Sequence, residues 1–209
     1  MRDRLSLASV FLAVLLVLVG ALGVCVAAQT PDAKRDNEKM QQSLDAILTR
    51  GHAPAVKGKT PAPLRTTFTD GQFNAWLLAD GKDNVPHGLL SPTVTFLAAS
   101  KITAKAVVDL DAVRKSKPRG MLDPMNLLSG LVPIMLTGTL SGAGGMATFD
   151  VESASLGTWP LPRGILQELI AYYSKSSEYP DGITLGKPFL LPAAVKALLI
   201  ARGTVTVVQ

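Results

Sequence analysis

Residues 94–110 have the sequence VTFLAASKITAKAVVDL, in which every even position except Ser100 is apolar. The odd positions include threonine, lysine and aspartate. Successive side chains of a β-strand point to opposite faces of the sheet, so a period of two predicts one buried face and one solvated face. Because strands usually have about 3 to 10 residues, we expect two strands here, joined by a turn at 99–101.

A second hairpin is predicted further along the chain. Residues 141–145 are Ser-Gly-Ala-Gly-Gly, and glycine supplies the positive φ that a tight turn requires. The flanking segments, 134–140 and 146–156, have the composition of strands. Three shorter strands complete the predicted sheet, at 183–185, 195–200 and 204–208.

A short helix is predicted just before the first hairpin. Thr69, followed three residues later by Gln72, is a capping box that starts a helix. Three large apolar residues then share one face of that helix: Phe73, Trp76 and Leu77. The next position on this face is Asp80, so the apolar surface is about one turn long.

A second helix and the fold class follow from the later part of the chain. Pro162 precedes a helix predicted at 164–173, whose apolar face contains Ile165, Leu166, Leu169, Ile170 and Tyr173. The predicted elements therefore indicate an α+β fold. We expect a curved, mostly antiparallel sheet of about six strands that wraps one or two helices.

The first 28 residues have the composition of an export signal. A short basic stretch precedes an uncharged apolar run from Leu5 to Ala28, which ends in small residues suited to signal peptidase. Cleavage after Ala28 is the favoured interpretation. The run is also long enough for an uncleaved membrane anchor, and Cys25 offers lipidation as a third option. All three options predict an exported protein in the periplasm or another extracytoplasmic space.

Residues 29–65 are expected to separate this signal or anchor from the domain at 66–209. A helix at 31–49 carries one narrow apolar stripe, formed by Met40, Leu44, Ile47 and Leu48. A Pro-, Lys- and Ala-rich linker follows it, up to Pro63. The helix is either a spacer between the membrane and the domain or a helix packed on the outside of the domain.

The composition argues against several classes of function. The net charge of +5 is made of scattered charges of both signs, which does not fit a nucleic-acid-binding surface. Cys25 is the one cysteine, so no disulfide, Cys-ligated zinc or thiol nucleophile is possible after residue 28. The common hydrolase, zincin, nucleotide and calcium motifs are missing. We therefore expect no enzyme activity, no metal site and no cofactor.

Carboxylates offer one remaining route to catalysis. A glycosidase-like pair could be drawn from Asp109, Asp111, Asp150 and Glu152. The alternation of the strands places these residues on the solvated face of the predicted sheet. A hydrolase is therefore the least favoured function.

One predicted connection is more apolar than connections usually are. Residues 121–133 join two strands and contain two methionines and four leucines, although most connections face water. Methionine-rich surfaces suit ligands of variable shape, such as acyl chains. The alternative is a short helix at 124–128 that plugs one end of the core. Three basic residues just before the segment are either solvated or suited to an anionic lipid headgroup: Lys115, Lys117 and Arg119.

Two groups of short motifs resemble a known family. The sequence FTDGQFNAWLL at 68–78, before a turn and long alternating strands, resembles small exported bacterial domains that are similar to the tubular lipid-binding family. WPLP at 159–162, Leu191-Pro192 and the closing strand at 204–208 also resemble that family, so the resemblance covers 66–209. It implies a sheet wrapped around a helix with an apolar tunnel, and lipid binding near a membrane. For Asn74 it implies a structural hydrogen bond from helix to strand.

The favoured function is non-enzymatic binding or carriage of a lipid or other apolar ligand in the cell envelope, near the membrane surface. Its candidate ligand contacts are Phe73, Trp76, Leu77, Met121, Met125, Leu128 and Leu131. The first three are also suited to a dry core. The alternative function is a structural or assembly module of the envelope, which docks onto a partner protein through its apolar loop.

Overall fold

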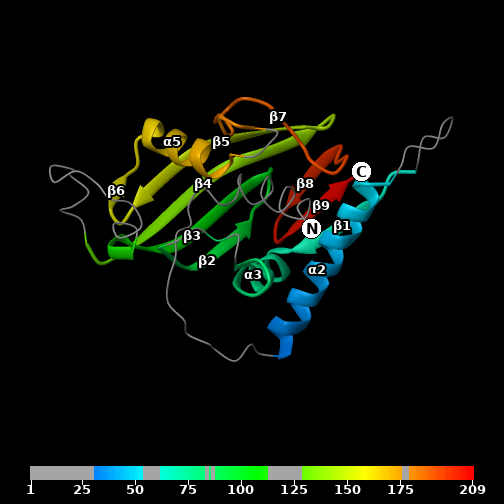
Figure 1. Ribbon diagram of the computed structural model, residues 1–209, viewed down its shortest axis with the longest axis horizontal. Helices are drawn as coiled ribbons and strands as arrows, with labels where there is room; N and C mark the ends of the chain where they lie inside the picture. Colours follow the sequence, from blue (N-terminus) through cyan, green and yellow to red (C-terminus); the bar gives the residue numbers. More distant parts are fainter. Residues whose placement is uncertain (1–30, 54–61, 83–84, 86–87, 113–128, 176–178) are drawn as a thin grey trace.

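The computed structural model describes residues 31–53, 62–82, 85, 88–112, 129–175 and 179–209. Its strands form a strongly curled antiparallel sheet, accompanied by helices (Figure 1). The strands are β1 (Arg65–Thr69), β2 (Leu89–Phe96), β3 (Lys101–Asp109), β4 (Leu131–Ala143), β5 (Met146–Leu156), β6 (Trp159–Pro160), β7 (Phe189–Leu190), β8 (Ala197–Ala201) and β9 (Thr204–Val208). The helices are α2 (Pro31–Gly51), α3 (Asp70–Leu78) and α5 (Arg163–Tyr173). The predicted α+β class with a curved antiparallel sheet is confirmed.

Six of the strands follow the order β1-β9-β8-β4-β3-β2. β5 pairs with the other side of β4, and its own outer edge is joined by β6 at one end and β7 at the opposite end. β4 pairs with β3 over its first nine residues and then meets β8 through Gly142 and Leu198, beyond the turn of the β2–β3 hairpin. This contact joins the β1, β9 and β8 strands to the rest of the sheet. The sequence patterns indicated neither β1 nor the two short strands.

The β2–β3 hairpin has the predicted alternation. Val94 pairs with Ala104 and Phe96 with Ile102, across a turn at 98–100 that lies one residue earlier than predicted. The even positions on the two strands from Val94 to Ala106 are all buried. The prediction of one buried and one solvated face is therefore confirmed for this hairpin.

The β4–β5 hairpin is longer than predicted. β4 begins at Leu131 and continues to Ala143, so the turn consists of Gly144 and Gly145, which have φ angles of 61° and 82°. Two consecutive positive φ angles match the right-handed twist of the flanking strands. The predicted turn at 141–145 was therefore too long. Residues 131–133, predicted as part of the apolar connection, belong to the strand.

Gly138 allows the two long strands to pack closely near a β-bulge. A Cβ atom at this position would lie 2.6 Å from the backbone oxygen of Asp150 and 2.8 Å from the ring of Phe149. Neither neighbour is the flexible end of a side chain. The glycine therefore leaves space for Phe149, which is among the largest fully buried side chains of the core.

Helix α5 packs along the β5 side of the sheet through Leu166 and Ile170, both 1% exposed. Ile165 was predicted on the same face but is 50% exposed, because it lies to one side of the buried stripe. The Gln167 side chain hydrogen-bonds to backbone groups of Ile183 and Leu185. Residues 183–185 were predicted as a strand; they are instead an irregular segment with two buried side chains that α5 holds in place.

Helix α2 packs against α3 and β1 instead of standing apart from the domain. Its Met40 and Ile47 are 1% and 2% exposed and belong to the same core as the sheet. Of the two roles left open for this helix, packing on the domain is the one that the structure has, and the spacer role does not apply to it. None of the helices in the described residues is both long and apolar enough to span a membrane. The predicted export segment, 1–28, lies outside the described residues.

Candidate functional site

Helix α3 starts at the predicted capping box. The backbone N–H of Gln72 donates to Oγ1 of Thr69 over 3.1 Å, and the backbone N–H of Thr69 donates to Oε1 of Gln72 over 3.0 Å. Each side chain thus satisfies a backbone donor that the first helical turn leaves unpaired. This arrangement fixes the point at which the chain leaves β1 and turns onto the sheet.

Asn74 connects α3 to the edge of the sheet. Its Nδ2 donates to the Val94 carbonyl over 2.8 Å, and the Val94 N–H donates to its Oδ1 over 2.7 Å. β2 ends the strand order, so the amide takes the place that a neighbouring strand would occupy beside Val94. The helix-to-strand hydrogen bond expected for Asn74 is confirmed by this geometry.

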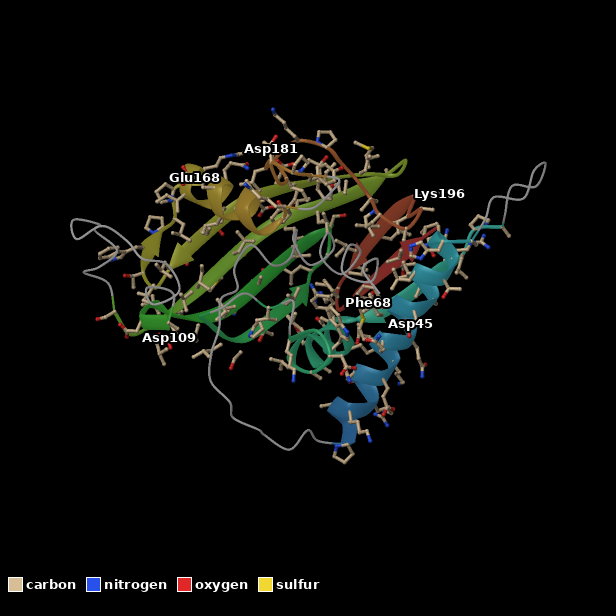
Figure 2. The ribbon with its side chains drawn as sticks, in the orientation of Figure 1. Asp45, Phe68, Asp109, Glu168, Asp181 and Lys196 are labelled. Atoms are coloured by element: carbon tan, nitrogen blue, oxygen red, sulfur yellow. The ribbon has the colours of Figure 1, made fainter. Side chains whose placement is uncertain are left out.

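The apolar face of α3 lies against the sheet in a cluster of aromatic rings. Phe73 lies 6.3 Å from Phe68, 6.2 Å from Phe96 and 5.9 Å from Trp76, measured between ring centroids. Phe73, Trp76 and Leu77 are 5%, 4% and 2% exposed, so the structure brings these three candidate residues together inside the core. Figure 2 shows Phe68, which comes from β1, close to α2.

Polar contacts hold α2 over the outer side of α3. The indole Nε1 of Trp76 donates to Oε1 of Gln41 over 3.1 Å, and Nδ2 of Asn37 donates to Oδ2 of Asp80 over 3.0 Å. Near the other end of α2, the side chain of Gln209 donates to the backbone oxygen of Ile47 over 2.8 Å. The position of Trp76 is therefore fixed both by the ring cluster and by α2.

The inner face of β3 and β4 is apolar along its length. Ala104 pairs with Leu136 and Ala106 with Ile134, and all four are buried with Ile102 beside them. In Figure 1, α3 lies toward the β2 side of the sheet and α5 toward the β5 side, so the middle of β3 and β4 runs between the two helices. Alanine has the smallest side chain apart from glycine, and this part of the inner face of β3 carries two alanines.

The remaining candidate contacts lie elsewhere. Met121, Met125 and Leu128 are outside the described residues. Leu131 is 61% exposed at the start of β4 and pairs with Asp109, on the outer face of the sheet. The structure therefore does not bring Leu131 together with the three residues of α3.

The carboxylates considered for catalysis have structural partners or lie at the surface. Asp109 accepts a hydrogen bond from the Ala112 N–H, and Asp111 accepts one from the Gly130 N–H, both over 2.9 Å. Glu152 lies on the outer face, where Lys101 donates to it over 2.9 Å and Thr139 donates over 2.9 Å. The hydrogen bond from Lys101 is the largest cause of a lowered pKa of Glu152, and the hydrogen bond from Thr139 lowers it further. Asp150 is exposed on the same strand.

Sequence patterns did not indicate that two large apolar side chains, Trp159 and Ile165, would be exposed. Trp159 is 68% exposed on β6, and Ile165 is 50% exposed on the first turns of α5. One feature of the sequence could have indicated the exposure of Trp159. This residue lies between a glycine-containing turn and two prolines, which is a poor place to bury a large ring.

Comparisons with other proteins leave the site to be interpreted from its own geometry. Family models, curated proteins and solved structures give no match to this chain. Within the described ranges, no three His, Cys, Asp or Glu side chains are grouped in a way that could hold a metal ion.

Proposed function

We propose that this protein binds or carries a lipid or another apolar molecule in the cell envelope, without catalysing a reaction. The observation that carries the proposal is the apolar inner face of a curled sheet, which continues from the α3 side to the α5 side past Ala104 and Ala106. An apolar ligand gains free energy in proportion to the apolar area that it removes from water, and a long concave strip suits an acyl chain.

The contacts of α3 support a framework role for its aromatic face. Phe73 and Trp76 hold the helix on the sheet, and Asn74 fixes it to the β2 edge. The ligand in this proposal lies along the inner face of β3 and β4, with the α3 residues at its side. The carboxylates support the non-enzymatic part of the proposal, because Asp109 and Asp111 accept hydrogen bonds from backbone N–H groups and Glu152 accepts one from Lys101.

The first test identifies the ligand directly. The protein is purified without detergent and examined by native mass spectrometry, followed by extraction and titration with a fluorescent fatty acid. We expect a copurified apolar molecule and saturable binding of the fatty acid. If neither is found, the proposal is wrong.

A second test distinguishes a ligand-binding face from a filled core. Ala106→Phe adds a ring to the inner face of β3, whereas the matched variant Ala201→Phe adds the same ring to an exposed position on β8. In a filled core the extra ring lowers the free energy of unfolding by about 1–3 kcal/mol. The proposal predicts a different result: Ala106→Phe loses the ligand while the ligand-free protein keeps its stability, and Ala201→Phe changes neither property.

The alternative function is an envelope assembly module that docks onto a partner protein. The exposed Leu131 favours it, because an apolar side chain that is 61% exposed is available for contact. Changing Met125 and Leu128 to serine should then abolish capture of the partner in a pull-down while leaving the lipid content unchanged. The lipid-binding proposal predicts that the lipid content falls.

A further inference from the structure

The inner face of the sheet is shielded from water. Ala104 and Ala106 on β3 are each 7% exposed, and Leu136, opposite Ala104 on β4, is 1% exposed. An apolar ligand reaches these side chains only if an element beside them moves, as lids do over many binding sites. In Figure 1, α3 and α5 lie on the two sides of this part of the sheet, so the contacts that hold each helix decide which of them can move.

Helix α3 is held at several points. Asn74 makes two hydrogen bonds to the backbone of Val94 on β2, and Phe73 lies among the rings of the aromatic cluster. The indole of Trp76 is also hydrogen-bonded to Gln41 of α2. Moving α3 would break all of these contacts, so it is the fixed border of the inner face.

Helix α5 is bound instead to the segment that follows it. Nε2 of Gln167 donates to the Ile183 carbonyl over 3.1 Å, and the Leu185 N–H donates to Oε1 of Gln167 over 2.7 Å. Just after the helix, Oγ of Ser174 accepts a hydrogen bond from the Ile183 N–H over 2.6 Å. These hydrogen bonds join α5 to residues 183–185, so the two parts can move as one body.

A glycine with a positive φ angle stands on each side of this body. Gly157 precedes β6 and has a φ angle of 61°, and Gly186 precedes β7 and has a φ angle of 74°. Between Gly157 and α5, Pro160 and Pro162 fix their own φ angles and restrict the residues before them. Hinges are a few loop residues that absorb large changes in φ and ψ, so the two glycines are the hinge positions. We call residues 158–175 and 179–185 the α5 flap.

The α5 flap meets the sheet through few directional contacts. β6 pairs with β5 over two residues, one of which, Pro160, has no N–H to donate. The Leu161 N–H donates to the Ala154 carbonyl over 2.9 Å. The rest of the contact is apolar, because Leu166 and Ile170 are each 1% exposed and belong to the core. Apolar contacts are not directional, so the chain of an apolar ligand can take the place of those that opening breaks.

The outer side of the α5 flap faces solvent. Glu168 of α5 and Asp181 of the following segment are both exposed, and Figure 2 shows them at the surface of the molecule. Solvent on this side leaves room for an outward movement.

We propose that the α5 flap is a lid, which swings outward as one body about Gly157 and Gly186 to admit an apolar ligand to the inner face. β7 lies beyond the second hinge and stays paired with β5, because Phe189 is 3% exposed and holds it in the core. This inference rests on the proposed function for its purpose, since a lid is needed only if the inner face takes up a ligand.

A removable disulfide tests the movement. Ser155→Cys with Pro160→Cys places two cysteines opposite each other on β5 and β6, across the edge that opens. Met146→Cys with Leu190→Cys does the same on β5 and β7, beyond the hinge, and serves as the matched control. Opposite residues of antiparallel strands have Cα atoms about 4.5–5.5 Å apart, which suits a disulfide. Both pairs are made in a full chain with Cys25→Ser, which removes the one natural thiol.

The rate of uptake of a fluorescent fatty acid is measured by stopped flow before and after reduction with dithiothreitol. We expect the oxidised Ser155→Cys, Pro160→Cys protein to take up the fatty acid at least about tenfold more slowly than the same protein after reduction. The oxidised and reduced forms of the control should have equal rates. Equal rates for both forms of the first pair, or the same slowing in both pairs, would overturn the proposal.

Hydrogen exchange measures the opening without a ligand. In the wild-type chain, amides of α5 should exchange at least about tenfold faster than those of α3, because the flap opens without global unfolding. The oxidised Ser155→Cys, Pro160→Cys disulfide should slow exchange in α5 and leave exchange in α3 unchanged. Equal protection of the two helices would show that α5 is as firmly held as α3 and is not a lid.

These two measurements separate failure of the inference from failure of the proposed function. If α5 exchanges fast and the disulfide slows it, but no fatty acid binds, the flap stands and the lipid-binding function is wrong. If the fatty acid binds at the same rate in both forms of the first pair, the proposed function stands and the flap is not the entrance.

Discussion

The substitution Asn74→Ala removes both hydrogen bonds between α3 and the edge strand β2, of 2.8 and 2.7 Å. The N–H and C=O of Val94 then face outward with no strand beside them, next to a side chain that is 3% exposed. An unsatisfied buried backbone group costs about 1–3 kcal/mol, and partial access of water at an edge favours the lower half of that range. Alanine regains roughly 0.6 kcal/mol as a better helix former. We therefore expect Asn74→Ala to lower the free energy of unfolding by about 2 kcal/mol.

Urea unfolding followed by circular dichroism and by the fluorescence of Trp76 measures this loss. The control is Gln42→Ala, which removes a polar side chain from an exposed position of α2. It should change the free energy of unfolding by less than about 0.5 kcal/mol. A loss for Asn74→Ala no larger than that of the control would show that the amide does not secure the edge of the sheet.

The variant Asn74→Asp examines the same hydrogen bonds through their pH dependence. An ionised carboxylate still accepts from the Val94 N–H but meets the Val94 carbonyl with a second oxygen, whereas the protonated acid donates to that carbonyl. The folded state therefore raises the pKa of the introduced carboxyl above its unfolded value of about 3.9. The stabilising contribution is complete below the unfolded pKa and is lost as the pH rises through the folded pKa. An unfolding free energy that follows the wild type at every pH between about 4 and 7 would refute this reasoning.

Three further predictions concern two positions in the sheet and the start of helix α3. Gly138→Ala places a methyl group 2.6 Å from the backbone oxygen of Asp150, and we expect urea unfolding to show a loss of about 3 kcal/mol. Lys101→Met removes the main cause of the lowered pKa of Glu152, so a carboxyl titration by NMR should show that pKa rising toward its ordinary value. In the wild type this ion pair contributes above the unfolded pKa of Glu152, and its contribution is lost as the pH falls through the lowered, folded pKa. Thr69→Ala removes the acceptor for the Gln72 N–H and should cost about 1 kcal/mol in the same unfolding assay.

Elements that depend on neighbouring residues could be predicted from the sequence. The alternation from Val94 to Leu110 determines which face of the first hairpin is buried, because the side chains of a strand point to alternate faces. The capping box at Thr69 and Gln72 is equally local, since both hydrogen bonds lie within one helical turn. These predictions are confirmed because the nearest neighbours in the sequence supply the partners.

Elements whose partners are far away in the sequence could not be predicted in the same way. β1 pairs with β9, so that Phe68 lies opposite Val205, and no pattern in residues 65–69 specifies that partner. Helix α2 shows a stripe of only four apolar residues, and its place on the domain depends also on the hydrogen bond from Trp76 to Gln41. A narrow apolar stripe fits a spacer helix and a packed helix equally well, unless the surface that the stripe contacts is already known.

The aromatic residues of the chain are unevenly distributed between the core and the surface. Aromatic residues make up 5% of the chain, and four of them, Phe68, Phe73, Phe96 and Trp76, meet in one cluster between α3 and the sheet. Aromatic side chains bury the largest apolar area in a core, so a chain with few of them gains most by placing them inside. Trp159 departs from this rule at 68% exposure. Trp159 stands on a strand of two residues between a glycine-containing turn and two prolines, so the chain around it offers the ring no core to enter.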